Sequence, residues 1–393
     1  MPESSWPPVD NSSVAPWSAF CTSRISILDG VTAYSDETTL QSSRVKLDQE
    51  LEALRVSMHT IQSRRNALAP ITRLHPEILA HIFSFLAAEE IPRKIIRRFR
   101  PRGFPAPSPI LRLGWMRVTH VCQAWRKAAL DTPSLWGIDV DSMRDCTSER
   151  LRRSKQAPLV VRYFQATDRL APEEQDVLKS LLSQTHRARE LELTCSPDHV
   201  TKNMANLLTV RAPLLESFVY SAPMYPAGAS CILPANIFAA NAPRLRKLML
   251  ADAKLPLQSP LYDNLTHLAM NTREHNPVSG LAFSRDELLG LLRRTLNLET
   301  LELAYSIPAG GSTFADASMV VDDPMQSSTD LAYSSPMRVS LPSIKKIKLC
   351  GEPADCLWIS EHMDIPAEAA LHLHCTERQP ADQDHLSARA ALV

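Results

Sequence analysis

The chain has 393 residues, enough for two or three domains with a sizeable core. Its 43 basic and 43 acidic side chains give a formal charge of zero, so no overall field directs it to nucleic acid or to an anionic membrane. No uncharged apolar run approaches the roughly 20 residues that a membrane span requires. The eight cysteines form no CxxC pair and the N-terminus has no signal-peptide pattern, so we expect reduced thiols in a cytoplasmic or nuclear protein.

The N-terminal region divides into two segments of different character. Residues 1–36 are rich in Ser, Pro and Thr without a sustained period, so we expect them to be disordered. Residues 37–69 are predicted to form a helix with an apolar seam at alternating steps of four and three. The seam consists of Leu47, Leu51, Leu54, Met58, Ile61 and Leu68, and Arg65 interrupts it. A dimerising coiled coil would have this spacing, but because the seam is short and interrupted we favour an amphipathic helix packed on the following domain or on its own domain.

An apolar helix is predicted to begin at Pro76, shortly after Leu74. Proline suits the first helical position because its missing N–H would have no partner there, and Glu77 complements the positive end of the helix dipole. The apolar residues at helical spacing are Ile78, Leu79, Ile82, Phe83 and Leu86.

A second apolar helix is predicted after Leu113. Its apolar residues at helical spacing are Val118, Val121, Cys122, Trp125 and Ala129. Pro133 should end this helix, because a residue before proline is driven out of the α region. Leu135 and Trp136 then follow as a bulky apolar pair.

These elements closely resemble an F-box, in the form found in fungal F-box proteins with leucine-rich-repeat-like C-terminal regions. The matching segments are Leu74-x-Pro76-Glu77-Ile78-Leu79-x-x-Ile82-Phe83, Val118-x-x-Val121-Cys122-x-x-Trp125-Arg126 and Pro133-x-Leu135-Trp136. The resemblance implies an F-box domain over residues 70–145 that docks to the Skp-type adaptor of a cullin–RING ubiquitin ligase. His75 replaces the usual proline, and an insertion over residues 89–112 is longer than a compact F-box needs. The adaptor-binding residues implied are Leu74, Pro76, Glu77, Ile78, Leu79, Ile82, Phe83, Val121, Cys122, Trp125 and Trp136.

The insertion contains a basic run from Arg93 to Arg102, with six basic residues interleaved with Ile and Phe. A nuclear-import signal or a nucleic-acid-binding patch can have this composition. We favour a solvent-exposed loop, because a run of like charges is most often a solvated face.

After Trp136 a strand-like pattern recurs, in which large apolar residues are separated first by two variable residues and then by one. Its copies are Leu215–Tyr220, Leu245–Leu250, Leu265–Met270, Leu298–Leu303 and Ile344–Leu349, with an incomplete copy at Arg189–Leu193. Leucine-rich repeats have this pattern, because their strands bury alternate leucines against the next turn of a solenoid. The fold class predicted is therefore an N-terminal helix and a three-helix F-box, followed by an irregular leucine-rich-repeat-like α/β solenoid over residues 146–377.

Helices are predicted between these strands. One begins at Pro172, and another begins at Ser284, which can form a capping box with Glu287. Residues 307–340 are rich in Ser, Asp, Gly and Pro and are predicted to be a disordered loop. We expect a further strand over residues 370–374 and a polar tail over residues 378–393.

The outward-facing strand positions are the predicted surface for a protein substrate. The charged and polar residues there are Glu190, Glu192, Lys247, His267, Glu302, Lys346 and Lys348. The row is acidic at its first strand and basic at its last, which suits a protein partner better than a uniform polyanion. An ordinary solvated strand face is the alternative for each of these residues.

No sequence motif points to catalysis. The chain has no glycine-rich phosphate loop, nucleophile elbow or HExxH motif, and the cluster His372, His374 and Cys375 offers too few ligands for a closed metal site. We therefore predict no cofactor and a non-catalytic, substrate-recognising subunit of an SCF-type ubiquitin ligase. Its partners would be the Skp-type adaptor, through it a cullin, and an unknown protein substrate, without membrane or nucleic acid. The rival hypothesis is a nuclear or nucleic-acid-associated scaffold that acts through the basic insertion.

Overall fold

The computed structural model describes residues 11–95, 110–165, 172–196, 208–222, 231–272, 284–308 and 338–376. Their contacts group the chain into two compact units. The first contains residues 1–79 and 118–128, and the second contains residues 80–117 and 129–393. No described helix is long and apolar enough to cross a membrane.

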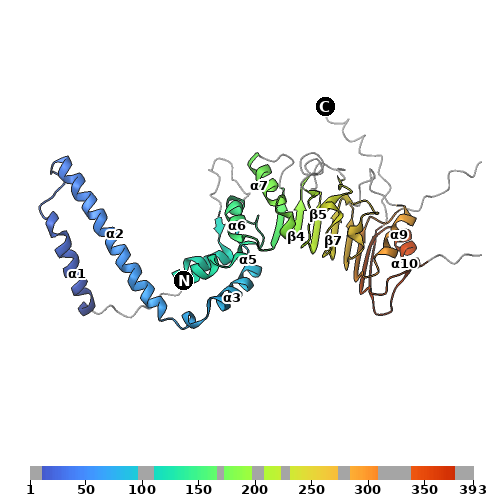
Figure 1. Ribbon diagram of the computed structural model, residues 1–393, viewed down its shortest axis with the longest axis horizontal. Helices are drawn as coiled ribbons and strands as arrows, with labels where there is room; N and C mark the ends of the chain where they lie inside the picture. Colours follow the sequence, from blue (N-terminus) through green and yellow to red (C-terminus); the bar gives the residue numbers. More distant parts are fainter. Residues whose placement is uncertain are drawn as a thin grey trace, which may run out of the picture. The chain divides into compact units, whose positions relative to one another are not determined.

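The N-terminal part of the first unit is a helical hairpin (Figure 1). Helix α1 (Asn11–Ile25) and helix α2 (Glu37–Ala67) are linked through the short η1 (Ser26–Leu28), and η2 (Pro70–Arg73) follows. The Asp36 side chain caps α2 by accepting a hydrogen bond from the Thr39 backbone N–H at 2.9 Å. The prediction of a helix over residues 37–69 is thus confirmed to within two residues.

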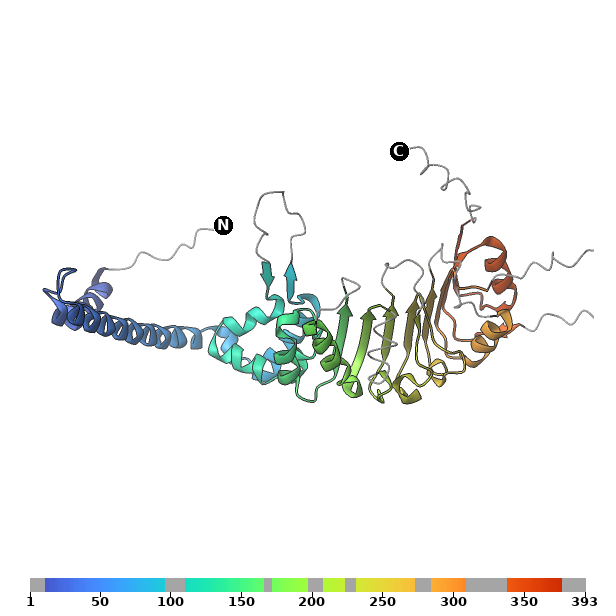
Figure 2. The same cartoon turned by 90° about the horizontal axis from the view of Figure 1, so that it is seen from above.

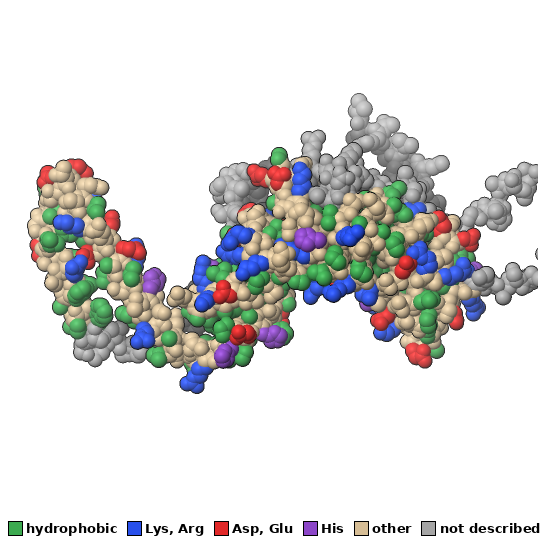
Figure 3. All heavy atoms as spheres, viewed as in Figure 1, with side chains coloured by type: hydrophobic (Ala, Val, Ile, Leu, Met, Phe, Trp, Pro, Cys, Tyr) green, Lys and Arg blue, Asp and Glu red, His purple; other side chains and the backbone are tan. Residues whose placement is uncertain are grey.

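The prediction of disorder over residues 1–36 is wrong where α1 lies, and residues 1–10 are outside the described residues. The two helices are joined by a long-range contact, in which the Arg24 guanidinium donates to both carboxylate oxygens of Glu50, at 3.1 and 2.5 Å. Arg24 and Glu50 are 26 positions apart, so their contact produces no repeating pattern in the sequence from which α1 could be predicted. Apolar side chains remain visible along both helices (Figure 3).

The predicted F-box segment contains three α-helices. These are α3 (Pro76–Glu89), α4 (Gln123–Leu130) and the single turn α5 (Pro133–Trp136). The second predicted helix is divided, since residues Gly114–His120 form the 3₁₀ segment η3 and the α-helix begins only at Gln123. α4 ends before Pro133, as the rule for residues that precede proline requires.

The insertion begins and ends as an antiparallel pair of strands, β1 (Arg93–Ile95) and β2 (Ile110–Arg112) (Figure 2). The loop predicted over residues 89–112 is therefore corrected at both ends, and residues 96–109 are outside the described residues. Gly114 follows β2 with φ +52°, where a Cβ would meet the Glu90 carbonyl oxygen. This glycine lets the chain pass close to the end of α3, where the Trp115 N–H donates to the Glu90 carbonyl at 2.8 Å.

The C-terminal part of the second unit is built on an eight-stranded, entirely parallel sheet (Figures 1 and 2). Each strand lies beside the strands of the same sheet that precede and follow it in the chain. The strands are β3 (Leu159–Phe164), β4 (Ala188–Thr194), β5 (Ser217–Ser221), β7 (Lys247–Ala251), β9 (His267–Asn271), β10 (Thr300–Ala304), β12 (Lys346–Gly351) and β14 (Ala370–Cys375). Seven of them coincide with the predicted strands. β3 was not predicted, because Leu159–Val161 is a continuous apolar run without alternation.

One face of the sheet forms the core of this part of the chain. The apolar residues Leu191, Phe218, Leu248, Leu268, Leu301 and Ile347 are aligned across neighbouring strands and are all buried. Buried residues of helices α7 (Pro172–Leu182), α9 (Arg285–Arg294) and α10 (Pro353–Glu361) join the same core. α9 has the predicted capping box, with Glu287 N–H to Ser284 Oγ at 3.1 Å and Ser284 N–H to Glu287 Oε2 at 2.8 Å.

Short elements complete this part of the chain. Two small parallel sheets pair β6 (Cys231–Ile232) with β8 (Ala253–Lys254) and β11 (Val339–Ser340) with β13 (Met363–Asp364). The predicted disordered loop is thus wrong at Val339–Ser340, whereas residues 309–337 and the tail from residue 377 are outside the described residues. The 3₁₀ turns are η4 (Arg144–Cys146), η5 (Thr185–Arg187), η7 (Ile237–Ala240) and η8 (Pro260–Tyr262).

A buried polar cluster lies ahead of β3, around helix α6 (Thr147–Ser154). The fully buried Arg150 guanidinium donates to Ser142 Oγ at 2.6 Å and to the Ile138 carbonyl oxygen. The buried carboxylate of Asp141 accepts a hydrogen bond from Thr147 Oγ1 at 3.2 Å and lies 3.5 Å from Arg144 Nε. Burial raises the pKa of Asp141 to about 6, although Arg144 and Thr147 act in the opposite direction.

Candidate functional site

An exposed apolar stripe runs along α3. It consists of Ile78, Ile82 and Phe85, whose spacing of four and three residues places them on one side of the helix. Phe85 is 63% exposed and Ile78 48% exposed, whereas Phe83 on a different side is completely buried. The His81 ring meets the Phe85 ring edge to face at 4.9 Å. We call Ile78, Ile82 and Phe85 the α3 stripe.

The sequence had proposed one set of adaptor-binding residues without separating core from surface. Leu79, Phe83 and Trp136 are buried and therefore support the fold rather than face a partner. Leu74, Cys122 and Trp125 are half-buried. The exposed members of the set are Pro76, Glu77, Ile78, Ile82 and Val121.

Trp136 is held by several contacts. Its Nε1–H donates to the Ala129 carbonyl oxygen at 2.9 Å, and its ring packs edge to face on the Trp115 ring at 5.1 Å. The Arg153 guanidinium lies 4.3 Å from the Trp136 ring centroid. Trp115 is fully buried and was not among the predicted residues, although its size and its position next to Gly114 were visible in the sequence.

Phe85 was not among the predicted adaptor-binding residues either. Its spacing from Ile78 and Ile82 continues the same helical side, so the signal was present in the sequence. Exposed aromatic side chains of this size are enriched in protein interfaces.

The outward face of the parallel sheet carries the predicted substrate-binding positions. In register across the middle strands lie Val219 of β5, Met249 of β7 and Ala269 of β9. Val219 and Met249 are half-buried and Ala269 is buried, so the centre of this face is apolar. We call these three residues the central strip. Lys247 and His267 lie at its edge and are exposed.

The charges at the two ends of this face are paired within the chain. Arg162 of β3 lies 3.2 Å from a Glu190 oxygen and 3.6 Å from a Glu192 oxygen. At the other end, Lys348 Nζ lies 2.6 Å from Glu302 Oε1, while Lys346 is half-buried beside it on β12. The predicted gradient from acidic to basic is therefore largely cancelled by ion pairs across strands, one of which involves the unpredicted strand β3.

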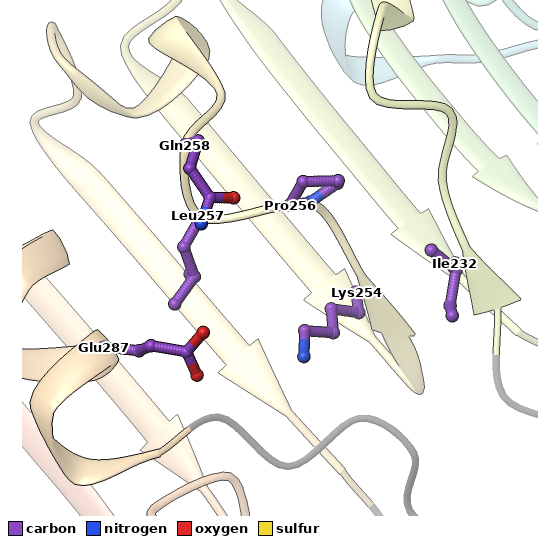
Figure 4. A pocket seen from close by; sticks show the side chains of 6 residues that line it. All are labelled: Ile232, Lys254, Pro256, Leu257, Gln258 and Glu287. Atoms are coloured by element: carbon purple, nitrogen blue, oxygen red, sulfur yellow. The ribbon is translucent and has the colours of Figure 1, made fainter.

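A small depression lies on the surface near β8 (Figure 4). It is lined by Ile232, Lys254, Pro256, Leu257, Gln258 and Glu287, and its volume is about 210 Å³. The Glu287 carboxylate is already used as a hydrogen-bond acceptor in the capping box of α9, and the pKa of Glu287 is lowered by those bonds to Ser284. This engagement makes the depression a poor candidate for acid–base chemistry.

The basic run of the insertion and the cluster of His372, His374 and Cys375 provide no further site among the described residues. The basic run is described only at its start, where Lys94 Nζ lies 2.6 Å from Asp145 Oδ2. His372, His374 and Cys375 are exposed on β14, and no group of three or more His, Cys, Asp or Glu residues within the described segments is arranged to hold a metal ion. All eight cysteines are free thiols.

Comparison with known protein families identifies one match. Residues 71–137 match the F-box-like family, and this range contains the α3 stripe, Trp115 and Trp136. No curated protein matches the chain. F-box domains are protein-interaction modules that typically bind Skp-type adaptors of SCF ligases, and this match supports an F-box protein.

Proposed function

We propose that this protein is a substrate-recognition adaptor of an SCF-type ubiquitin ligase, in which the F-box-like segment docks a Skp-type adaptor and, through it, a cullin. The observation that carries this proposal is the α3 stripe, an exposed apolar surface inside the segment that matches the F-box-like family. Exposed apolar side chains in a row gain free energy when a partner covers them. Catalysis belongs to the partners, and this protein contributes the effective concentration of substrate near the ligase.

The second part of the proposal assigns the substrate to the outward face of the parallel sheet, interpreted as a leucine-rich-repeat-like solenoid. Its support is the sequential strand order and the leucine spacing, both typical of repeat proteins. The central strip offers an apolar contact area, while the ion pairs at either end provide polar borders. A protein segment with an apolar centre and a polar periphery complements such a face.

Affinity purification of the full chain tests adaptor docking. We expect the Skp-type adaptor and a cullin to co-purify with the parent chain and with Leu111→Asp, an exposed apolar position on β2 outside the stripe. Ile78→Asp should lose both partners, because it places a charge in the proposed contact. Co-purification that Ile78→Asp leaves unchanged would refute docking through α3.

The substrate surface needs a separate variant. Met249→Asp should retain the adaptor, since it lies on the sheet, but should lose a subset of the proteins that quantitative mass spectrometry finds with the parent. Ile232→Asp, at an exposed apolar position on β6, is the matched control. If the two variants capture the same proteins as the parent, the central strip does not bind substrate.

A further inference from the structure

The α1–α2 hairpin has almost no core of its own. From Val14 to Arg73 the only buried residue is Ser43, although the segment contains many large apolar side chains. Leu51, Met58 and Ile61 of α2 are each more than half exposed. Helices in water gain most of their stability from burying an apolar face, so a hairpin without a core requires a further contact. The interpretation of α2 as a helix packed on the F-box or on its own domain does not account for this exposure.

We propose that α2 forms an antiparallel coiled coil with α2 of a second copy of this chain. The inference is independent of the function proposed above, since it concerns only residues 37–68. Its first support is the heptad register, in which Leu51 and Met58 occupy a positions. The d positions are Leu40, Leu47, Leu54, Ile61 and Leu68. A seam with this period packs best on another seam with the same period. Among the described helices only α2, with 31 residues, is long enough to carry four heptads.

The charges decide between the two possible orientations. Arg44 and Arg65 also occupy a positions of this register. In a parallel dimer each a residue faces its own counterpart, so two pairs of arginines would meet in the seam and repel one another. In an antiparallel dimer a positions face d positions. With Leu51 opposite Ile61 and Leu54 opposite Met58, each arginine then faces a leucine of the second copy, Arg65 facing Leu47 and Arg44 facing Leu68.

The flanking positions are compatible with the same register. In the antiparallel arrangement Glu50, at a g position, lies near Arg64 of the second copy, which would add a second cation to the ion pair that Glu50 already makes with Arg24 of its own chain at 2.5 Å. Arg55 approaches Arg55 of the second copy at the rim, where its charge is partly balanced by Glu52 of its own helix at 3.3 Å. The parallel arrangement would instead pair Glu50 with Arg55, but it would retain the arginine pairs inside the seam.

Sedimentation equilibrium of the full chain tests the dimer. We expect the parent to be dimeric at micromolar concentrations and Leu51→Lys to raise the dimer dissociation constant at least about 100-fold, because a lysine would be buried without a partner. Val56→Lys is the matched control, since Val56 is 56% exposed on the same helix but lies outside the seam. A monomeric parent, or equal loss of the dimer in both variants, would overturn the proposal.

Disulfide trapping tests the orientation. Ser57 occupies a g position near the two-fold axis of the antiparallel arrangement, so Ser57→Cys should form a cross-linked dimer under mild oxidation. Leu54→Cys should not, because d positions meet one another only in a parallel coiled coil. Mass spectrometry of the cross-linked peptide separates the new cysteine from the native ones. Cross-linking at position 54 and not at 57 would refute the antiparallel register.

Discussion

Two phenylalanines of α3 allow stability and binding to be separated on one helix. Phe83 is completely buried, so Phe83→Ala should lower the free energy of unfolding by about 3–5 kcal/mol. Phe85 is 63% exposed, so Phe85→Ala removes only about a third of the side-chain surface from contact with the rest of the protein. Burying a whole phenylalanine is worth about 1.5–3 kcal/mol, and Phe85→Ala should therefore cost only about 0.5–1 kcal/mol.

The binding effects should have the opposite order. If the α3 stripe docks the adaptor, Phe85→Ala should weaken the purified complex by about 30-fold, which corresponds to an anchor residue worth about 2 kcal/mol. Urea denaturation followed by circular dichroism measures stability, and isothermal titration calorimetry with the purified adaptor measures affinity. A Phe85→Ala variant as unstable as Phe83→Ala, or one with unchanged affinity, would refute this division of α3 into two sides.

Three further predictions concern single residues of the second unit. Gly114→Ala should destabilise the protein by at least about 1–2 kcal/mol in urea denaturation, since φ is +52° and a Cβ would lie 2.8 Å from the Ile91 carbonyl carbon. Gly290 lies in α9 with open space around it, so Gly290→Ala should stabilise the protein by about 0.5–1 kcal/mol in the same assay. Burial raises the pKa of Asp141 from 3.8 to about 6, so the folded state favours the neutral carboxyl group. The resulting stabilisation, about 3 kcal/mol at most, is fully present below pH 3.8 and is lost as the pH rises through 6. Asp141→Asn should therefore gain melting temperature relative to the parent between pH 4.5 and pH 7, and a difference that does not change with pH would contradict the assigned burial. Ser284→Ala should cost about 1 kcal/mol and speed amide exchange in the first turn of α9, because the Glu287 N–H loses its acceptor; unchanged exchange there would argue against the capping box.

The sequence predicted those elements whose signals are local. The strand pattern around Leu248 or Leu301 and the capping box of Ser284 and Glu287 depend only on residues a few positions apart, and the structure has them where expected. β3 was missed because a continuous apolar run carries no period that separates strand from helix. α1 was missed because its visible support, the pair Arg24–Glu50, joins distant positions.

The candidate site was predicted only as an unsorted set. The spacing of Ile78, Leu79, Ile82 and Phe83 shows that all four lie on a helix, but it does not show which side is covered by the rest of the chain. Burial resolves this question, since Leu79 and Phe83 are inside and the two isoleucines are exposed. The charge gradient on the sheet failed for a related reason, because pairs such as Lys348–Glu302 depend on strand register.

The sequential order of the eight-stranded sheet also bears on how the chain folds. Every strand of this sheet pairs only with the strands of the same sheet that precede and follow it in the chain, so each pairing requires the closure of a single connection between strands. Such topologies have low contact order for a parallel sheet, and pairing can start at any adjacent pair and spread outward. β14 is exposed along its entire length and has β12 as its neighbour on one side only, so opening of the sheet should begin at β14 and proceed inward. A destabilising substitution in β14 or β12 would then unpair the strands at this end one at a time, while β4 to β9 stay paired.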